Sequence, residues 1–136
     1  MKRLIYLLFC CTGPVSLLAQ AADSLPLKRI YLLRPNQYVG ALAKIRIRVN
    51  DKVVSLPNDA YMIVECRADS VTLKLENRRL SGESLTPLVT YKPISYFVTI
   101  PEEHAHKMDR LILTEVDKDG YDVYAKKVTR QVNPKD

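Results

Sequence analysis

The sequence predicts an all-β protein, a single antiparallel β-sandwich of about seven to eight short strands that follows an N-terminal signal peptide. Three observations support this fold class. Apolar and polar residues alternate with a period of two over most of the chain. Pro, Gly, Asn and Asp residues interrupt these runs at short intervals, as turns between strands do. After residue 22, no apolar stripe of helical period continues for three turns.

Length and composition restrict the fold further. The chain has 136 residues, of which 47% are hydrophobic and 26% charged, as in an ordinary globular domain. These values exclude a multidomain enzyme, a multi-span membrane protein, a coiled coil and a disordered chain. We interpret residues 22–136 as one domain, which is long enough to bury a two-sheet core without disulfides.

The first 21 residues have the layout of a secretory signal peptide. Lys2 and Arg3 precede an apolar stretch, and Ala19-Gln20-Ala21 supplies small residues at alternate positions for signal peptidase. A membrane anchor is the competing interpretation, but Gly13-Pro14 interrupts the stretch, which is shorter than the ~20 apolar residues that a spanning helix needs. We therefore expect cleavage before Ala22 and no transmembrane segment in the mature chain.

Two cysteines within this segment raise the alternative of a lipoprotein. Lipid attachment requires a small residue before the cysteine, whereas Phe9 precedes Cys10 and Cys10 precedes Cys11. Both cysteines also lie too early, inside the apolar stretch. We therefore predict a mature protein without lipid.

Signal removal changes the charge and the cysteine count. Lys2 and Arg3 are lost, so the formal net charge falls from +6 to +4, and Cys66 is the single remaining cysteine. No internal disulfide can then form. Cys66 lies in register with Met62 and Val64 on one face of a predicted strand, so we expect a buried, inert thiol. A reactive or intermolecular thiol is the alternative.

Six strands are expected before the C-terminal region. Ile45, Ile47 and Val49 share one face of the second, and Asn50-Asp51 is a turn signal that joins it to the third as a hairpin. Residues 78–93 form the longest irregular stretch, and residues 101–107 a loop. The six predicted strands cover residues 28–33, 43–50, 52–56, 60–66, 70–76 and 94–100.

Two further strands, 110–116 and 121–128, are expected to form a C-terminal hairpin. The connecting residues 117–120 end in Gly120, which permits the positive φ of hairpin turns. The segment superficially resembles a calcium loop, but its glycine is at the fourth position instead of the sixth, and Val128 occupies the twelfth. We therefore predict a turn and no calcium site.

Three segments resemble the family of domains of unknown function numbered 2846. They are Tyr31–Ala41, with an Arg-Pro step and a following glycine, the hairpin-like Val49–Val54, and the aromatic-led strand at Tyr61. The resemblance covers about residues 28–100. It implies an exported bacterial β-sandwich, often associated with the envelope and without an established activity. Arg67-Ala68-Asp69 replaces the usual Pro-Gly turn, and members are often lipoproteins, a pattern from which this signal departs.

The segment from Arg34 to Gly40 has two interpretations. Pro35 cannot extend strand hydrogen bonding, and Gly40 permits a backbone conformation that a Cβ would block. We expect a connection between sheets that is fixed by an arginine–carbonyl bond from Arg34 and by packing of Tyr38. The alternative is a ligand site lined by Arg34 and Tyr38.

Catalytic and metal-binding candidates are few. His104 and His106 have a spacing that would place both imidazoles on one strand face beside Glu102 and Glu103, as a transition metal requires. Pro101 and the surrounding charges instead indicate a solvated loop. The sequence contains no Gly-x-Ser-x-Gly elbow, phosphate-binding loop, dinucleotide fingerprint or Cys-x-x-Cys pair. We therefore predict no catalytic residues, no metal site, no cofactor and no enzymatic activity.

Lys44, Arg46 and Arg48 form the most regular charge feature of the chain. They alternate with the apolar residues of the second predicted strand and would lie about 6.6–6.8 Å apart along its outer face. Such a row suits phosphates, carboxylates or an acidic protein. The alternative is a solvent-exposed face paired with acidic neighbours.

The sequence thus predicts a non-enzymatic interaction module, periplasmic or extracellular. Its expected partner is an envelope component or protein, and an anionic partner would contact Lys44, Arg46 and Arg48. Nucleic acid is excluded as a partner by export. Two alternatives remain open: a carrier that binds a small ligand between the sheets, and a hydrolase with an unrecognised site.

Overall fold

Within the described residues of the computed structural model, the chain forms nine strands and one helix. The predicted signal peptide, Tyr38 and Gly40, and the histidines His104 and His106 all lie outside the described residues. The described residues are 24–36, 44–76, 87–101 and 111–134.

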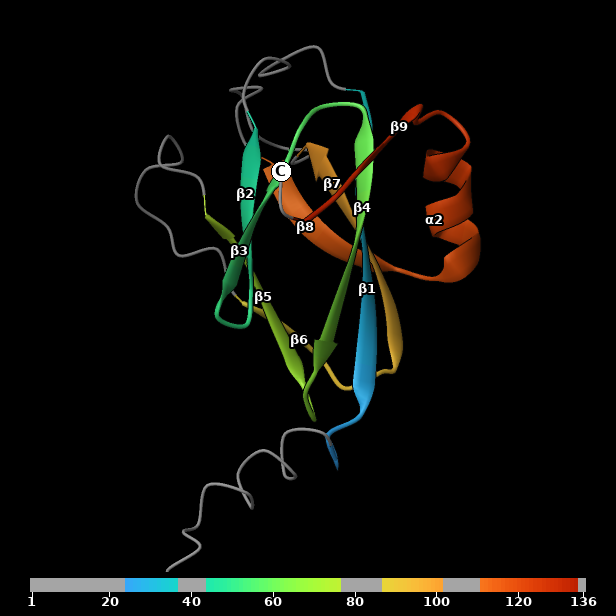
Figure 1. Cartoon of the computed structure of the whole chain (residues 1–136). Helices are drawn as coiled ribbons and strands as arrows, with labels where there is room; N and C mark the ends of the chain where they lie inside the picture. The colour runs from blue at the N-terminus through green and yellow to red at the C-terminus, as the bar shows by residue number, and fades with distance from the viewer. Residues whose placement is uncertain (1–23, 37–43, 77–86, 102–110, 135–136) are drawn as a thin grey trace, which may run out of the picture.

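The strands form two sheets that face each other, as Figure 1 shows. The five-stranded sheet has the order β8 (Leu111–Val116), β7 (Ile94–Pro101), β1 (Leu27–Arg34), β4 (Ala60–Arg67) and β9 (Arg130–Val132). The four-stranded sheet has the order β3 (Lys52–Leu56), β2 (Ile45–Val49), β5 (Val71–Glu76) and β6 (Leu88–Thr90). The helix α2 (Lys118–Ala125) lies on the outer side of the five-stranded sheet. The prediction of a mostly β chain with two sheets is confirmed.

The two sheets share one hydrophobic core. Strand alternation produces it, because every second side chain of a strand points to the same face. On β2 the apolar residues are buried and Arg46 and Arg48 are exposed, which confirms the predicted alternation. The core members from the four-stranded sheet include Ile47, Val54, Leu56, Val71 and Leu73, and those from the five-stranded sheet include Ile30, Leu32, Met62, Val64 and Phe97.

Seven of the eight predicted strands are present, with small shifts at their ends. The structure adds two strands of three residues, β6 and β9, that the sequence pattern did not reveal. On β7, Tyr96, Val98 and Ile100 share one face, as their alternation predicts. The main core, however, receives Phe97 from the opposite face. Those three residues pack instead on the side that α2 covers.

The prediction of a purely antiparallel arrangement is wrong for two strand pairs. β1 pairs with β7 in parallel, and β4 pairs with β9 in parallel. Parallel neighbours need a long connection. Between β1 and β7 the chain supplies one, because it forms β4 and all four strands of the other sheet before β7 begins. The alternation of β2 and β5 is correct locally, but such a pattern carries no information on which strands become neighbours.

The predicted C-terminal hairpin is also wrong: residues 118–125 form the helix α2. The Asp117 side chain caps the helix by accepting a hydrogen bond from the Gly120 N–H at 2.7 Å. Lys118 and Asp122 form an ion pair one turn apart at 2.6 Å. The apolar residues of the segment recur at helical spacing and pack against the five-stranded sheet; they are Tyr121, Tyr124, Ala125 and Val128.

Strand β1 is therefore buried on both faces. Ile30 and Leu32 contribute to the main core, whereas Leu33 joins the cluster beneath α2. Tyrosine rings dominate this second cluster: Tyr31 stacks on Tyr96 with ring centroids 5.0 Å apart, and Tyr121 of the helix meets both rings. The outer face of the five-stranded sheet thus becomes a second, aromatic core.

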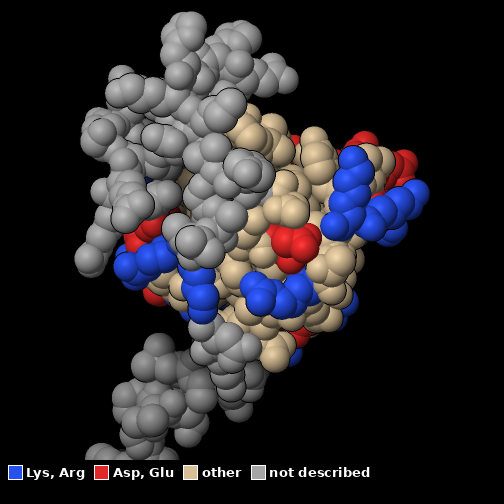
Figure 2. Space-filling view, turned by 90° about the horizontal axis from the view of Figure 1, so that it is seen from above, with Lys and Arg blue, Asp and Glu red and all other residues tan. Residues whose placement is uncertain are grey.

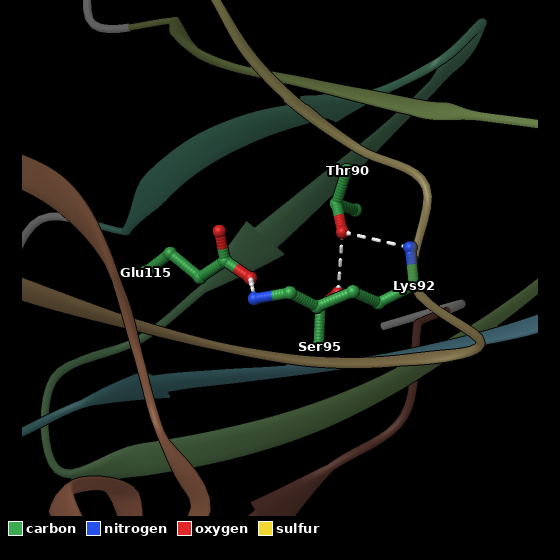
Figure 3. Close-up of polar contacts among 4 residues, drawn as sticks. All are labelled: Thr90, Lys92, Ser95 and Glu115. Atoms are coloured by element: carbon green, nitrogen blue, oxygen red, sulfur yellow. Dashed lines mark hydrogen bonds and ion pairs between the residues drawn. The ribbon is translucent and has the colours of Figure 1, made fainter.

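The chain crosses from one sheet to the other between β6 and β7. The Thr90 and Ser95 hydroxyls, both buried, lie 2.7 Å apart and form a hydrogen bond across this crossing, as Figure 3 shows. The Lys92 N–H donates to the Thr90 hydroxyl, and the Lys92 ammonium pairs with Glu115 of β8 at 2.7 Å. These contacts fix the backbone on either side of Tyr91.

Candidate functional site: a basic face on the four-stranded sheet

The outward residues of β2 are cationic. Because Ile45, Ile47 and Val49 turn into the core, the intervening side chains must point to solvent. Lys44, which immediately precedes the strand, is exposed as well. The structure thus brings together the three cations that the sequence singled out.

The neighbouring strand β5 extends this charged surface. In the antiparallel register, Arg46 lies opposite Glu76 and Arg48 lies opposite Lys74. Lys74 is exposed, because it alternates with Leu73 and Leu75, which are buried. We call the surface formed by Lys44, Arg46, Arg48, Lys74 and Glu76 the basic face. It carries four cations and one carboxylate.

Glu76 is the counter-ion of this face. Its Oε1 accepts a hydrogen bond from Arg48 Nε at 2.5 Å. That hydrogen bond lowers the pKa of the Glu76 carboxyl below its ordinary value, and the charges of Arg46 and Lys74 act in the same direction. The pair is exposed, so its contribution to folding stability is small. Arg48 directly opposite Lys74 is unfavourable for the sheet, because like charges on cross-strand neighbours repel.

Two hydrogen bonds at the end of β2 hold the strands of the basic face in register. Asn50, at the turn after β2, adopts a left-handed backbone with φ of 51°. Its N–H donates to the Thr72 carbonyl oxygen at 2.9 Å, and its Oδ1 accepts from the Thr72 N–H. The turn of one hairpin is thereby tied to the next strand, which fixes the register that sets Arg48 beside Lys74.

Charge is distributed differently at the end of the molecule that lies at the top in Figure 1. Figure 2 looks down on this end, and where described residues form the surface, its lysine and arginine side chains lie in separate groups with carboxylates between them. The basic face is instead a row along one strand with a fourth cation beside it.

Sequence reasoning missed Lys74 as a member of this face. The alternation of residues 70–76 shows that Lys74 points away from the core. What the pattern lacked is the pairing of β5 with β2, which a single sequence does not reveal.

Arg34, the other candidate contact residue, is buried and lies away from this face. Its Nη1 donates to the carbonyl oxygen of Leu56 at 3.4 Å, which confirms the expected arginine–carbonyl bond. Burial lowers the pKa of the Arg34 guanidinium. The arginine therefore links β1 of one sheet to β3 of the other.

Cys66 is half-buried and packs against the main core beside Met62 and Val64, and its thiol is free. Burial raises the pKa of this thiol, and the nearby Lys28 ammonium opposes that shift only in part. The thiol is thus only partly buried, whereas the sequence predicted a buried one; its raised pKa leaves little thiolate at neutral pH.

Among the described residues, no group of three or more His, Cys, Asp or Glu side chains is arranged to hold a metal ion. The described part of the chain likewise has no helix with the length and apolar character needed to cross a membrane. No family model, curated protein or solved structure matches this chain.

Proposed function

We propose that residues 22–136 are an exported, non-enzymatic β-sandwich domain that binds an anionic component of the cell envelope through the basic face. One observation carries the proposal: among the residues that the structure describes, four cations and a single carboxylate share one exposed sheet face, and three of the cations form a row along β2. Such a surface attracts anions at long range.

Export is supported by the layout of residues 1–21, and an envelope location by the resemblance to the family numbered 2846. On this proposal the mature chain begins at Ala22, carries no lipid and acts in the periplasm or outside the cell. A bacterial origin is part of the same proposal.

An interaction module is favoured over a carrier by the packing between the sheets. Ile30, Ile47 and Leu73 have no exposed surface and fill the space that a ligand would need. An exposed charged face, in contrast, suits a partner that offers many anionic groups, because each contact on an exposed surface is weak and several must act together.

The test compares wild type with a variant in which Lys44, Arg46 and Arg48 are all replaced by Gln. Both are sedimented with isolated envelope at ~0.05 M and ~0.3 M salt, since added salt shortens the Debye length and weakens charge-dependent binding. We expect wild type to bind at low salt and to lose binding at high salt, and the variant to bind at neither.

Two controls make the result specific. Glu76→Gln removes the one carboxylate from the same face and should strengthen binding, since Glu76 competes with an anion for Arg48. Melting temperatures should stay within several degrees of one another, because exposed charges of this kind rarely contribute more than ~0.5 kcal/mol each. Equal sedimentation of the folded triple variant and wild type would refute the proposal.

A further inference from the structure

Exposed apolar side chains continue the surface of the basic face toward β6. Val89 pairs with Thr72 of β5, and both are exposed on the outer side of the sheet. Lys74 is two residues beyond Thr72 on that side, which makes it the diagonal neighbour of Val89. Val89 keeps 49% of its surface exposed although it lies in a strand. The outer surface of the sheet therefore changes from charged at Lys74 to apolar at Val89, and we call Val89 and the following Tyr91 the apolar edge.

Tyr91 follows at the end of this edge and is 73% exposed, the largest exposure among the large apolar side chains of the described residues. Its backbone is held firmly: the ammonium of Lys28, a buried residue, donates to the Tyr91 carbonyl oxygen, and Thr90 is fixed by Ser95. The phenol ring is thus presented to solvent on a rigid support. An aromatic ring in this position gains nothing from the protein core.

From these observations we infer that the basic face docks on a membrane surface rich in anionic lipid, with Val89 and Tyr91 entering the headgroup layer; the inference rests on the proposed function. Lys44, Arg46, Arg48 and Lys74 would contact lipid phosphates. Tyrosine favours this layer, because its ring is apolar and its hydroxyl polar. Cations and an apolar edge together supply the two signals that stable peripheral binding requires.

A soluble polyanion would satisfy the charges but offers no apolar layer for Tyr91 and Val89. An acidic protein would need an apolar pocket at a fixed distance from its carboxylates, whereas an anionic lipid surface offers phosphates and an adjoining apolar layer everywhere. The apolar edge therefore decides in favour of a lipid surface.

The first experiment measures binding to vesicles of phosphatidylcholine with and without phosphatidylglycerol. Wild type should bind only the anionic vesicles. Replacing Lys44, Arg46 and Arg48 by Gln should weaken binding on the order of a hundredfold, since each cation near an anionic surface contributes about 1 kcal/mol. The matched control replaces the exposed Lys118, Lys126 and Lys127 of the α2 region by Gln; this variant should bind within a few-fold of wild type.

The second experiment tests the apolar edge. The chain contains no tryptophan, so Tyr91→Trp introduces a single tryptophan, whose emission can be excited selectively. Its emission should shift to shorter wavelength when anionic vesicles are added. The matched control is Val123→Trp, on the exposed side of α2, where the side chain is 58% exposed but far from the basic face in the fold. That emission should not change.

The outcomes separate the inference from the function on which it rests. If wild type ignores anionic vesicles while its binding to isolated envelope still depends on the three cations, the inference is wrong and the proposed function stands. Failure to bind either preparation contradicts both. Charge-dependent vesicle binding without a shift in the emission of the Tyr91→Trp variant also overturns the inference, because the apolar edge then stays in water. Coincident melting curves exclude unfolding as the cause.

Discussion

The two sheets of this protein have similar inner faces and very different outer faces. The four-stranded sheet leaves its outer face open and charged, with Arg46, Arg48 and Lys74 in contact with solvent. The five-stranded sheet covers much of its outer face with α2 and with the rings of Tyr31, Tyr96 and Tyr121. The alternating side chains of β2 therefore point in turn to the core and to solvent. Those of β1 point in turn to the main core and to the aromatic cluster beneath α2.

This difference shows what the two sheets contribute. A strand that is apolar on both faces, such as β1, must be covered on both, and α2 provides the second cover. A strand with a cationic outer face needs no cover and is free to meet a partner. The five-stranded sheet thus stabilises the molecule, and the four-stranded sheet is the one that we assign to binding.

The largest expected effect tests this comparison directly. Leu33→Ala, on the outer side of β1, should lower the free energy of unfolding by about 2–5 kcal/mol, as in any well-packed core. Lys74→Ala, on the outer side of β5, should change it by less than ~0.5 kcal/mol. Chemical denaturation measures both. Similar small effects for the two variants would show that α2 does not cover the sheet.

A smaller effect is expected at the start of the helix. Asp117→Ala removes the cap that accepts the Gly120 N–H and should lower the free energy of unfolding by about 0.5–2 kcal/mol. Asp117→Asn keeps an acceptor and should restore most of this loss. Equal stability of the Ala and Asn variants would contradict a capping role, and denaturation curves of the three proteins decide the matter.

The smallest effect concerns Tyr121, whose buried hydroxyl has no hydrogen-bond partner within the described residues. Tyr121→Phe should raise the free energy of unfolding by about 1 kcal/mol, because an unsatisfied buried polar group is removed. Tyr61→Phe is the control: its exposed hydroxyl bonds to Gln131, and its loss should not stabilise.

Tyr121 also predicts that the free energy of unfolding depends on pH in the alkaline range. Burial raises the pKa of the Tyr121 phenol above its ordinary value of 10.0. The unfolded chain therefore releases this proton at a lower pH than the folded protein does. The free energy of unfolding therefore does not depend on this group below about pH 10 and falls as the pH rises above it. Denaturation at increasing pH should show a shallower loss for Tyr121→Phe than for wild type; parallel curves would contradict burial of the phenol.

Sequence reasoning succeeded where burial alone determines structure. The strict alternation from Lys44 to Val49 correctly placed three cations outside and three apolar residues inside. It failed at residues 117–128, where two periodicities compete. The spacing of Tyr121, Tyr124, Ala125 and Val128 and the capping Asp117 were visible signals for a helix. Gly120, which suits a hairpin turn, also serves a capped helix.

Pairing between distant strands was beyond the reach of the pattern. Lys74 belongs to the basic face only because β5 pairs with β2, and Val89 joins it only because β6 pairs with β5. Both pairings depend on tertiary packing, which a single chain of residues does not display. The signal peptide, the anionic partner and the family resemblance stay predictions.

The parallel pairs described above have a consequence for the order in which the protein folds. The β2–β3 hairpin closes over two residues, so its loop entropy cost is small and it should form early. β1, in contrast, waits for β7, and β4 waits for β9 near the C-terminus. Sheets that depend on such distant partners fold slowly. The five-stranded sheet therefore cannot be completed until the chain as far as Val132 is available for pairing.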